Sequence, residues 1–161
     1  KVKEQKDKVN LHSYLVVIIN NEANTILGRF TAASADGRLA GEPMANANNP
    51  VGGTDKNGLT AMLNSLTKLD THIHAGAVQN MTLSKELFTE QKEVMKNILK
   101  TYFKKGGQQA MINVLNRHDL ENAMKEPDKY GHIMVRVGGF SARFVTLAPD
   151  VQKEIASRTH Y

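Results

Sequence analysis

The longest uninterrupted apolar run in this chain is Leu15–Ile19, in which four of the five residues are β-branched. A short run of this kind predicts a strand buried on both faces, and it is far shorter than the roughly 20 residues that cross a bilayer. We therefore expect a strand over Leu11–Asn20, a turn over Asn20–Asn24 and a return strand over Thr25–Ala32. The preceding residues, 1–10, are rich in Lys and also contain Glu, Gln and Asp, which predicts a solvated tail or the end of a surface helix.

Apolar residues recur at helical spacing in several later segments, which predicts helices over Gly58–Leu69, Thr89–Lys105, Asp119–Lys125 and Pro149–Arg158. Strands are expected over Gln108–Asn116 and His132–Val137. The Thr89–Lys105 helix also carries lysines every four residues, at Lys92, Lys96, Lys100 and Lys104. A solvated helix face explains these lysines, and an anionic docking surface is the alternative.

The composition excludes several kinds of functional site. The chain has 161 residues, 40% hydrophobic and 23% charged, which is typical of one globular domain. It contains no cysteine, so a disulfide, a thiolate metal site and a cysteine nucleophile are all excluded within these residues. The net charge is +5, but only 6% of residues are aromatic, and no nucleic-acid site is predicted.

No signal peptide is visible at the start, so a cytoplasmic setting without membrane attachment is expected. The first residue is Lys1, which indicates processing or part of a longer chain.

Two polar segments call for a separate reading. Residues 34–56 are rich in Gly, Pro, Asn and Asp, and a loop of this length favours a functional role. Within it, Asp36-Gly37-Arg38 is read either as a plain turn with an ion pair or as part of an active site. The sequence Asp70-Thr71-His72-Ile73-His74 could hold a metal, but structural histidines are the preferred interpretation, and no metal site is predicted.

The segment Val135–Phe144 carries two adjacent glycines, Gly138 and Gly139, between strand-forming residues. Glycine allows a tight turn or a close backbone approach at such a position. The residues alone therefore predict a hairpin and nothing more.

This segment resembles the glycyl radical signature of the pyruvate formate-lyase superfamily, Arg-Val-x-Gly-(Tyr/Phe)-(Ser/Ala)-x-x-Phe. The matching positions are Arg136, Val137, Gly139, Phe140, Ser141 and Phe144. The resemblance extends to Tyr102-Phe103, Gly106-Gly107 and Asn113-Val114 upstream and to 151–159 downstream. It also covers the Asp36-Gly37-Arg38 and Asn57-Gly58 blocks, although Ala35 and Leu59 stand where the family usually has proline.

The resemblance implies that Gly139 stores a radical on its α-carbon. A radical-SAM activating enzyme, which uses S-adenosylmethionine and a 4Fe-4S cluster, would abstract the hydrogen atom. The glycyl radical would then generate a thiyl radical on a cysteine. Arg136, Val137, Gly138, Phe140, Ser141 and Phe144 would support the radical loop. No metal is implied in this chain.

The implied fold is α/β, the C-terminal part of a ten-stranded barrel with the glycine loop between strands. Residues 11–107 would supply barrel strands and helices, and 108–161 the glycine radical domain. Because this chain has no cysteine, the thiyl residue must come from another chain or a missing N-terminal region. If Gly139 lies at the tip of a buried loop, the activating enzyme can reach it only once it is exposed, and we then expect residues after about Gln108 to swing out as a unit.

Three function classes remain open at this stage. The chain is the catalytic glycine-bearing part of an enzyme, a stand-alone radical cofactor protein that repairs an oxygen-cleaved enzyme, or a decayed remnant, which the intact signature disfavours. Phe140–Arg143, 33–38 and His74–Asn80 resemble the alkyl- and arylsuccinate synthases, which add a hydrocarbon to fumarate and work with small accessory subunits. In that case Arg38 and Arg143 would bind a dicarboxylate, with Gln79 and Asn80 nearby. A decarboxylase, dehydratase or formate acetyltransferase-type lyase is the alternative.

Overall fold

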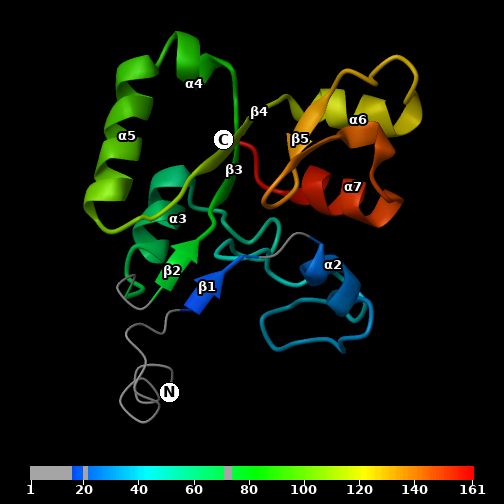
Figure 1. Cartoon of the computed structure of the whole chain (residues 1–161), viewed down its shortest axis with the longest axis horizontal. Helices are drawn as coiled ribbons and strands as arrows, with labels where there is room; N and C mark the ends of the chain where they lie inside the picture. Colours follow the sequence, from blue (N-terminus) through cyan, green and yellow to red (C-terminus); the bar gives the residue numbers. More distant parts are fainter. Residues whose placement is uncertain (1–15, 20–21, 71–73) are drawn as a thin grey trace.

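The computed structural model describes residues 16–19, 22–70 and 74–161 (Figure 1). Its helices and strands alternate along much of the chain. In order they are β1 (Val16–Ile18), α2 (Ala23–Gly28), α3 (Leu59–Leu66), β2 (His74–Ala77), β3 (Asn80–Leu83), α4 (Glu86–Thr89), α5 (Lys92–Lys104), β4 (Met111–Val114), α6 (Arg117–Lys125), β5 (Met134–Arg136), β6 (Ser141–Arg143), a 3₁₀ turn η2 (Phe144–Thr146) and α7 (Pro149–Ser157). Over the described residues, no helix is both long enough and apolar enough to span a membrane.

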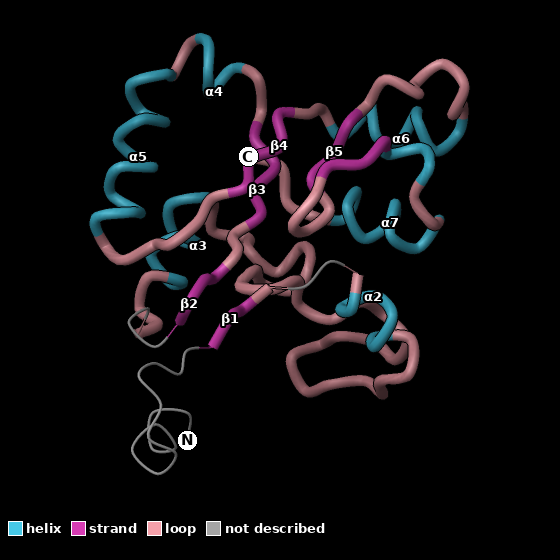
Figure 2. The backbone as a smooth tube through the Cα atoms, viewed as in Figure 1, coloured by secondary structure: helices cyan, strands magenta, loops and turns pink. Residues whose placement is uncertain are grey.

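The strands form three pairs, two parallel and one antiparallel. β1 pairs with β2 and β3 pairs with β4 in parallel, while β5 and β6 form an antiparallel hairpin. A parallel pair needs a crossover connection, and α4 and α5 supply it between β3 and β4 (Figure 2). The chain is therefore α/β, as expected.

Buried apolar side chains form two separate cores. The first core is Leu59, Met62, Leu63, Met81, Leu83, Met95 and Tyr102. The second core is Leu120, Ala123, Ile133, Val135, Val137, Phe144, Val151, Ile155 and Ala156. Ile112 packs against the first core and Leu115 against the second, so the two cores part at the end of β4. We call residues 22–114 the first unit and residues 115–161 the second unit. The predicted division at residue 108 stays a prediction.

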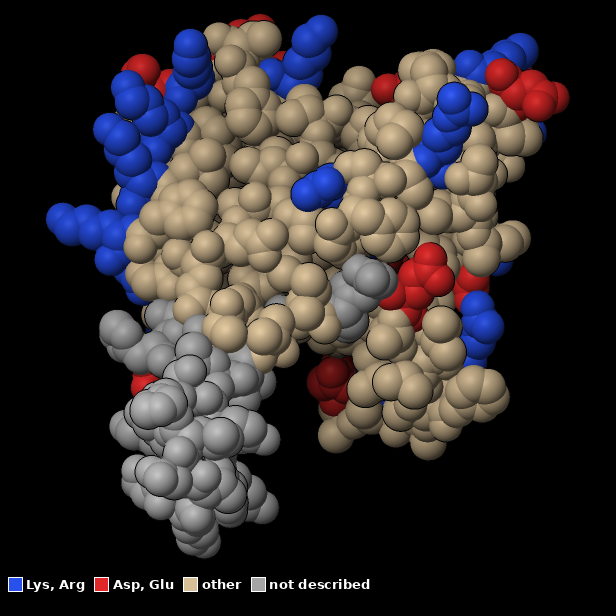
Figure 3. All heavy atoms as spheres, viewed as in Figure 1, with Lys and Arg blue, Asp and Glu red and all other residues tan. Residues whose placement is uncertain are grey.

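The amphipathic helices are confirmed, because α3, α5, α6 and α7 lie within or close to their predicted ranges. The hairpin of β5 and β6 is confirmed as well. Met95 and Tyr102, which recur at helical spacing in α5, are buried, while lysines line the outer face of this helix (Figure 3). That burial accounts for the helical periodicity of the segment.

The predicted return strand over Thr25–Ala32 is wrong, because α2 occupies its first half and the remaining residues form a turn and a loop. Glu22 accepts hydrogen bonds from the backbone N–H groups of Thr25 and Ile26, which starts a helical turn in spite of the β-branched side chains. The predicted hairpin is therefore wrong too, since β1 pairs with β2 far along the chain. Val17 is 54% exposed, so the prediction of burial on both faces fails for this residue. The predicted tail, the first residues of this strand and Asn20 and Asn21 of the turn lie outside the described residues.

Strands β2 and β3 were not predicted, because β2 consists mostly of small residues and the polar–apolar alternation of β3 covers only four residues. All four residues of β3 are buried, although two of them, Asn80 and Thr82, are polar. Hydrogen bonds to distant loops compensate the cost of burying these polar residues. Such long-range bonds cannot be predicted from the local sequence pattern.

Candidate functional site

Gly138 and Gly139 form the two-residue turn of the β5–β6 hairpin. Arg136 pairs with Ser141, and the backbone N–H of Val137 donates to the carbonyl of Phe140 at 3.0 Å. Only the two glycines lie between Val137 and Phe140. Gly138 is buried, whereas Gly139 is exposed at the tip. The structure therefore presents the α-carbon of Gly139 at the end of a tight, small-residue loop.

The predicted support residues hold the base of this hairpin. The backbone N–H of Arg136 donates to Asn113 Oδ1 of β4 at 2.9 Å, and its guanidinium donates to Ser141 Oγ at 3.1 Å. Val137 and Phe144 are fully buried in the second core. Phe140, by contrast, is 42% exposed beside the turn. Burial below the turn fixes the hairpin, and Gly139 is exposed at its tip within these 161 residues.

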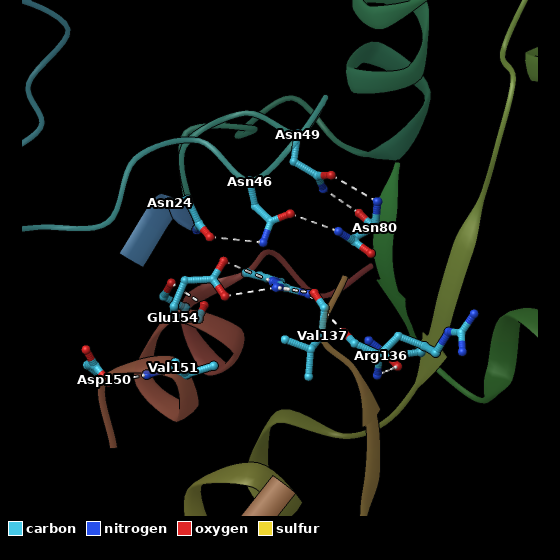
Figure 4. A network of polar contacts seen from close by, with 12 residues as sticks. Asn24, Asn46, Asn49, Asn80, Arg136, Val137, Asp150, Val151 and Glu154 are labelled. Atoms are coloured by element: carbon cyan, nitrogen blue, oxygen red, sulfur yellow. Dashed lines mark hydrogen bonds and ion pairs between the residues drawn. The ribbon is translucent and has the colours of Figure 1, made fainter. Parts of the chain in front are cut away.

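Arg158 binds the same hairpin from the end of α7, and the sequence analysis did not name it as a site residue. Its Nη1 and Nη2 donate to the carbonyls of Arg136 and Val137 at 3.4 and 3.3 Å (Figure 4). Glu154 holds the guanidinium with two hydrogen bonds of 3.1 and 2.9 Å. The two side chains are only 9% and 11% exposed. The available signal was the family-like 151–159 segment, which contains both residues.

The hairpin suits radical storage for a reason intrinsic to glycine. Without a side chain, the α-carbon of Gly139 can flatten after loss of a hydrogen atom. The amide nitrogen and carbonyl on either side then delocalise the unpaired electron. A Cβ atom would oppose this planarity.

Arg38, predicted as a substrate ligand, is engaged by its own loop. It is 7% exposed, and its Nη1 donates to the carbonyls of Leu39 and Glu42 at 3.1 and 2.9 Å. Its Nη2 donates to the carbonyl of Ala32. These bonds give Arg38 a loop-forming role without any carboxylate ligand. Arg143 lies in β6 with its side chain exposed. A substrate role for either arginine stays a prediction.

Gln79 and Asn80 are buried at the start of β3. Asn80 Nδ2 donates to Asn46 Oδ1 at 3.1 Å, and its backbone N–H donates to Asn49 Oδ1 at 2.9 Å (Figure 4). Gln79 is fully buried and its amide nitrogen lies 3.4 Å from Met62 Sδ. The asparagines thus tie the long polar loop to β3 within the first unit. Binding of substrate by Gln79 and Asn80 stays a prediction.

A cavity of about 430 Å³ lies between this loop, β3 and α7. It brings together Asn46, Asp55, Asn80, Glu154, Arg158 and Tyr161. Gly139, Arg38 and Arg143 are not among its lining residues, so the predicted site residues do not share one pocket. Only Asn80 of the predicted substrate ligands reaches it.

Within the described ranges, no group of three or more His, Asp or Glu side chains could hold a metal ion. His72, the central residue of the Asp70–His74 motif, lies outside those ranges. The sequence motif therefore stays untested.

The parallel β3–β4 crossover and the glycine hairpin fit the α/β fold and the glycine loop that the resemblance implies. Comparison with known proteins agrees: a family model described as "Glycine radical" matches residues 44–145, which include the whole hairpin. The chain belongs to this glycine radical family. It is 37% identical over 143 residues to a probable dehydratase of Escherichia coli (strain K12), covering 86% of this chain and 18% of that protein. It is 31% identical over 170 residues to formate acetyltransferase of Haemophilus influenzae, covering 99% and 21%.

Solved structures show the same relationship. A glycerol-bound glycerol dehydratase from Clostridium butyricum superposes with a TM-score of 0.86 at 32% identity, covering 92% of this chain and 19% of that one. A glycyl radical enzyme from Archaeoglobus fulgidus gives 0.83 at 33% identity, covering 91% and 19%. The fold is thus a C-terminal piece of a glycyl radical enzyme barrel. The chain spans about a fifth of the length of these relatives. They give no support to a particular closeness to the succinate synthases.

Proposed function

We propose that this chain is the radical-bearing C-terminal part of a glycyl radical enzyme and that Gly139 stores the radical. The observation that carries this proposal is the position of Gly139, at the tip of a hairpin whose base is buried and held by Arg136 and Arg158. A radical-SAM activating enzyme removes one hydrogen atom from the Gly139 α-carbon. The resulting radical takes a hydrogen atom from a cysteine thiol, which restores the glycine and leaves a thiyl radical for the substrate.

The cysteine belongs to another chain or region in this proposal, because these 161 residues contain none. Exposed apolar residues support a partner surface on α2 and the loop that follows it. Leu27, Phe30 and Leu39 are 57%, 85% and 63% exposed, more than large apolar side chains usually are. Burial of these residues against the cysteine-bearing part would remove them from water. An oxygen-sensitive radical also fits the expected reducing, cytoplasmic setting.

The relatives favour a lyase reaction for the enzyme of which this chain is a part. The relatives described above include a dehydratase and a formate acetyltransferase, and a decarboxylase subunit of Clostridium scatologenes is 34% identical over 137 residues. Addition of a hydrocarbon to fumarate has weaker support, since Arg38 already binds three carbonyls of its own loop. A stand-alone repair protein is also disfavoured, because the first unit adds a complete β3–α5–β4 crossover beyond the hairpin.

The test is reconstitution under anaerobic conditions. The chain is mixed with the activating enzyme and a cysteine-bearing partner, and then supplied separately with a vicinal diol, a hydroxyarylacetate, pyruvate with coenzyme A, or toluene with fumarate. We expect product from one of the three lyase substrates, and none when Gly139→Ala replaces the wild type. A radical that forms on the chain without product from any substrate would contradict the catalytic role.

A further inference from the structure

The segment after α7, at the end of the second unit, lies on the first unit. The backbone N–H of Tyr161 donates to the carbonyl of Thr82 at 3.1 Å, and Ser84 N–H donates to the carbonyl of Tyr161 at 2.6 Å. The Tyr161 side chain packs against the first core. Figure 1 shows this segment, in red, running from α7 across to β3. The second unit therefore reaches back to the first through its last residues.

Two hydroxyl groups of this segment converge on one carboxylate of the first unit. Thr159 Oγ1 donates to Asp55 Oδ1, and Tyr161 Oη donates to Asp55 Oδ2. Asp55 lies in the loop before α3, and all three residues line the 430 Å³ cavity. Hydrogen bonds from hydroxyl groups to a carboxylate are stronger than those between neutral groups. Partial burial strengthens them further.

The other polar links between the units are weaker or lie at the junction. Arg29 pairs with Asp150, but these side chains are 50% and 35% exposed, and an exposed pair contributes little. The bond from Arg136 to Asn113 lies beside the end of β4, where the cores part. A movement about this point would leave both cores intact. Separation of the units would, however, break every contact of residues 159–161 with Asp55 and β3.

We propose that Asp55, Thr159 and Tyr161 form a latch that holds the Gly139-bearing second unit closed on the first. Residues 115–116, between β4 and α6, are the hinge. Release of the latch lets the second unit turn away without unfolding. The consequence for Gly139 rests on the proposed function: an open second unit brings its glycine into the activating enzyme faster than a closed one.

The test uses the whole chain and a pair of shape-conserving substitutions. Thr159→Val with Tyr161→Phe removes both hydroxyl donors while keeping the methyl group and the aromatic ring. The matched control is Thr146→Val with Tyr130→Phe, which removes two hydroxyl groups within the second unit. Hydrogen exchange is followed at the amides of Ser84 and Tyr161, at the α5 amides of the first unit and at the Phe144 amide, which donates to Ile133 in the second.

We expect the latch variant to exchange at Ser84 and Tyr161 at least tenfold faster than wild type, with α5 and Phe144 unchanged, and the control to match wild type at Ser84. Unchanged exchange at Ser84, or equal acceleration in α5 and Phe144, would overturn the latch. The rate of radical formation with the activating enzyme is then compared. A faster rate in the latch variant supports the consequence for Gly139, and an unchanged rate overturns it. Absence of any radical in the wild type counts against the proposed function and leaves the exchange result to decide the latch.

Discussion

The turn that carries Gly139 rests on a buried ion pair formed by Glu154 and Arg158, well beyond it in the sequence. Arg158 lies at the end of α7, yet its guanidinium binds the carbonyls just below the glycine turn, and Glu154 holds it there. The family-like 151–159 segment marked both residues in the sequence. Their role could not be predicted, because it depends on carbonyls of a strand some 20 residues earlier, whose position only the folded hairpin defines.

We predict that Arg158→Ala destabilises the chain by about 3–5 kcal/mol, because it leaves the Glu154 carboxylate buried without its partner. Replacement of both residues by alanine should cost less than the sum of the single changes. The control is Arg117→Ala, which breaks an exposed pair with Glu121 and should cost below about 1 kcal/mol. Urea unfolding measures all four variants. Equal losses for Arg158→Ala and Arg117→Ala would show that the buried pair does not hold the hairpin.

Among the elements, those with a periodic apolar pattern were predictable. Met95 and Tyr102 recur on one face of α5, and both are buried, so local spacing was enough to find the helix. α2 lacked such a stripe, and its β-branched residues favoured a strand until the contacts of the folded loop decided otherwise. β2 could not be matched to β1, because parallel partners lie far apart in sequence.

Two aromatic residues at and just after the β5–β6 hairpin have opposite environments, which allows a matched test. Phe144 is completely buried in the second core, and Phe140 is 42% exposed beside the turn. We expect Phe144→Ala to lower the free energy of unfolding by about 3–5 kcal/mol and Phe140→Ala by no more than about 1 kcal/mol. Thermal unfolding compares the two. A larger loss for Phe140→Ala than for Phe144→Ala would show that Phe140, and not Phe144, packs in the core.

At the scale of the whole molecule, two cores joined by one strand explain how a rigid glycine hairpin can belong to a movable unit. The resemblance predicted both the fold class and the expectation of movement, whereas the position of the junction came from side-chain packing. Ile112 and Leu115 are close in sequence and both apolar, and nothing in their type indicates that they face different cores.

The stability of the folded chain should fall in acid. Burial, and to a lesser extent the charge of Arg117, lowers the pKa of His160 from its usual value of 6.5. The folded chain therefore favours neutral His160, so stability is full above pH 6.5 and falls as the pH drops below it, where the unfolded chain takes up more protons. Urea unfolding between pH 8 and 5.5 measures this dependence. His160→Gln should flatten the profile, and an equally steep profile in that variant would exclude His160 as its source.

The central claim is that Gly139 carries the radical, and anaerobic electron paramagnetic resonance after treatment with a radical-SAM activating enzyme tests it most directly. Gly131→Ala is the glycine control, because Gly131 lies outside the signature and a Cβ there would meet only the carbonyl oxygen of Pro127, at 3.8 Å. We predict a doublet, split by the remaining α-hydrogen, in the wild type and in Gly131→Ala, and no doublet in Gly139→Ala. A doublet of equal intensity in Gly139→Ala would place the radical on another residue and contradict the account.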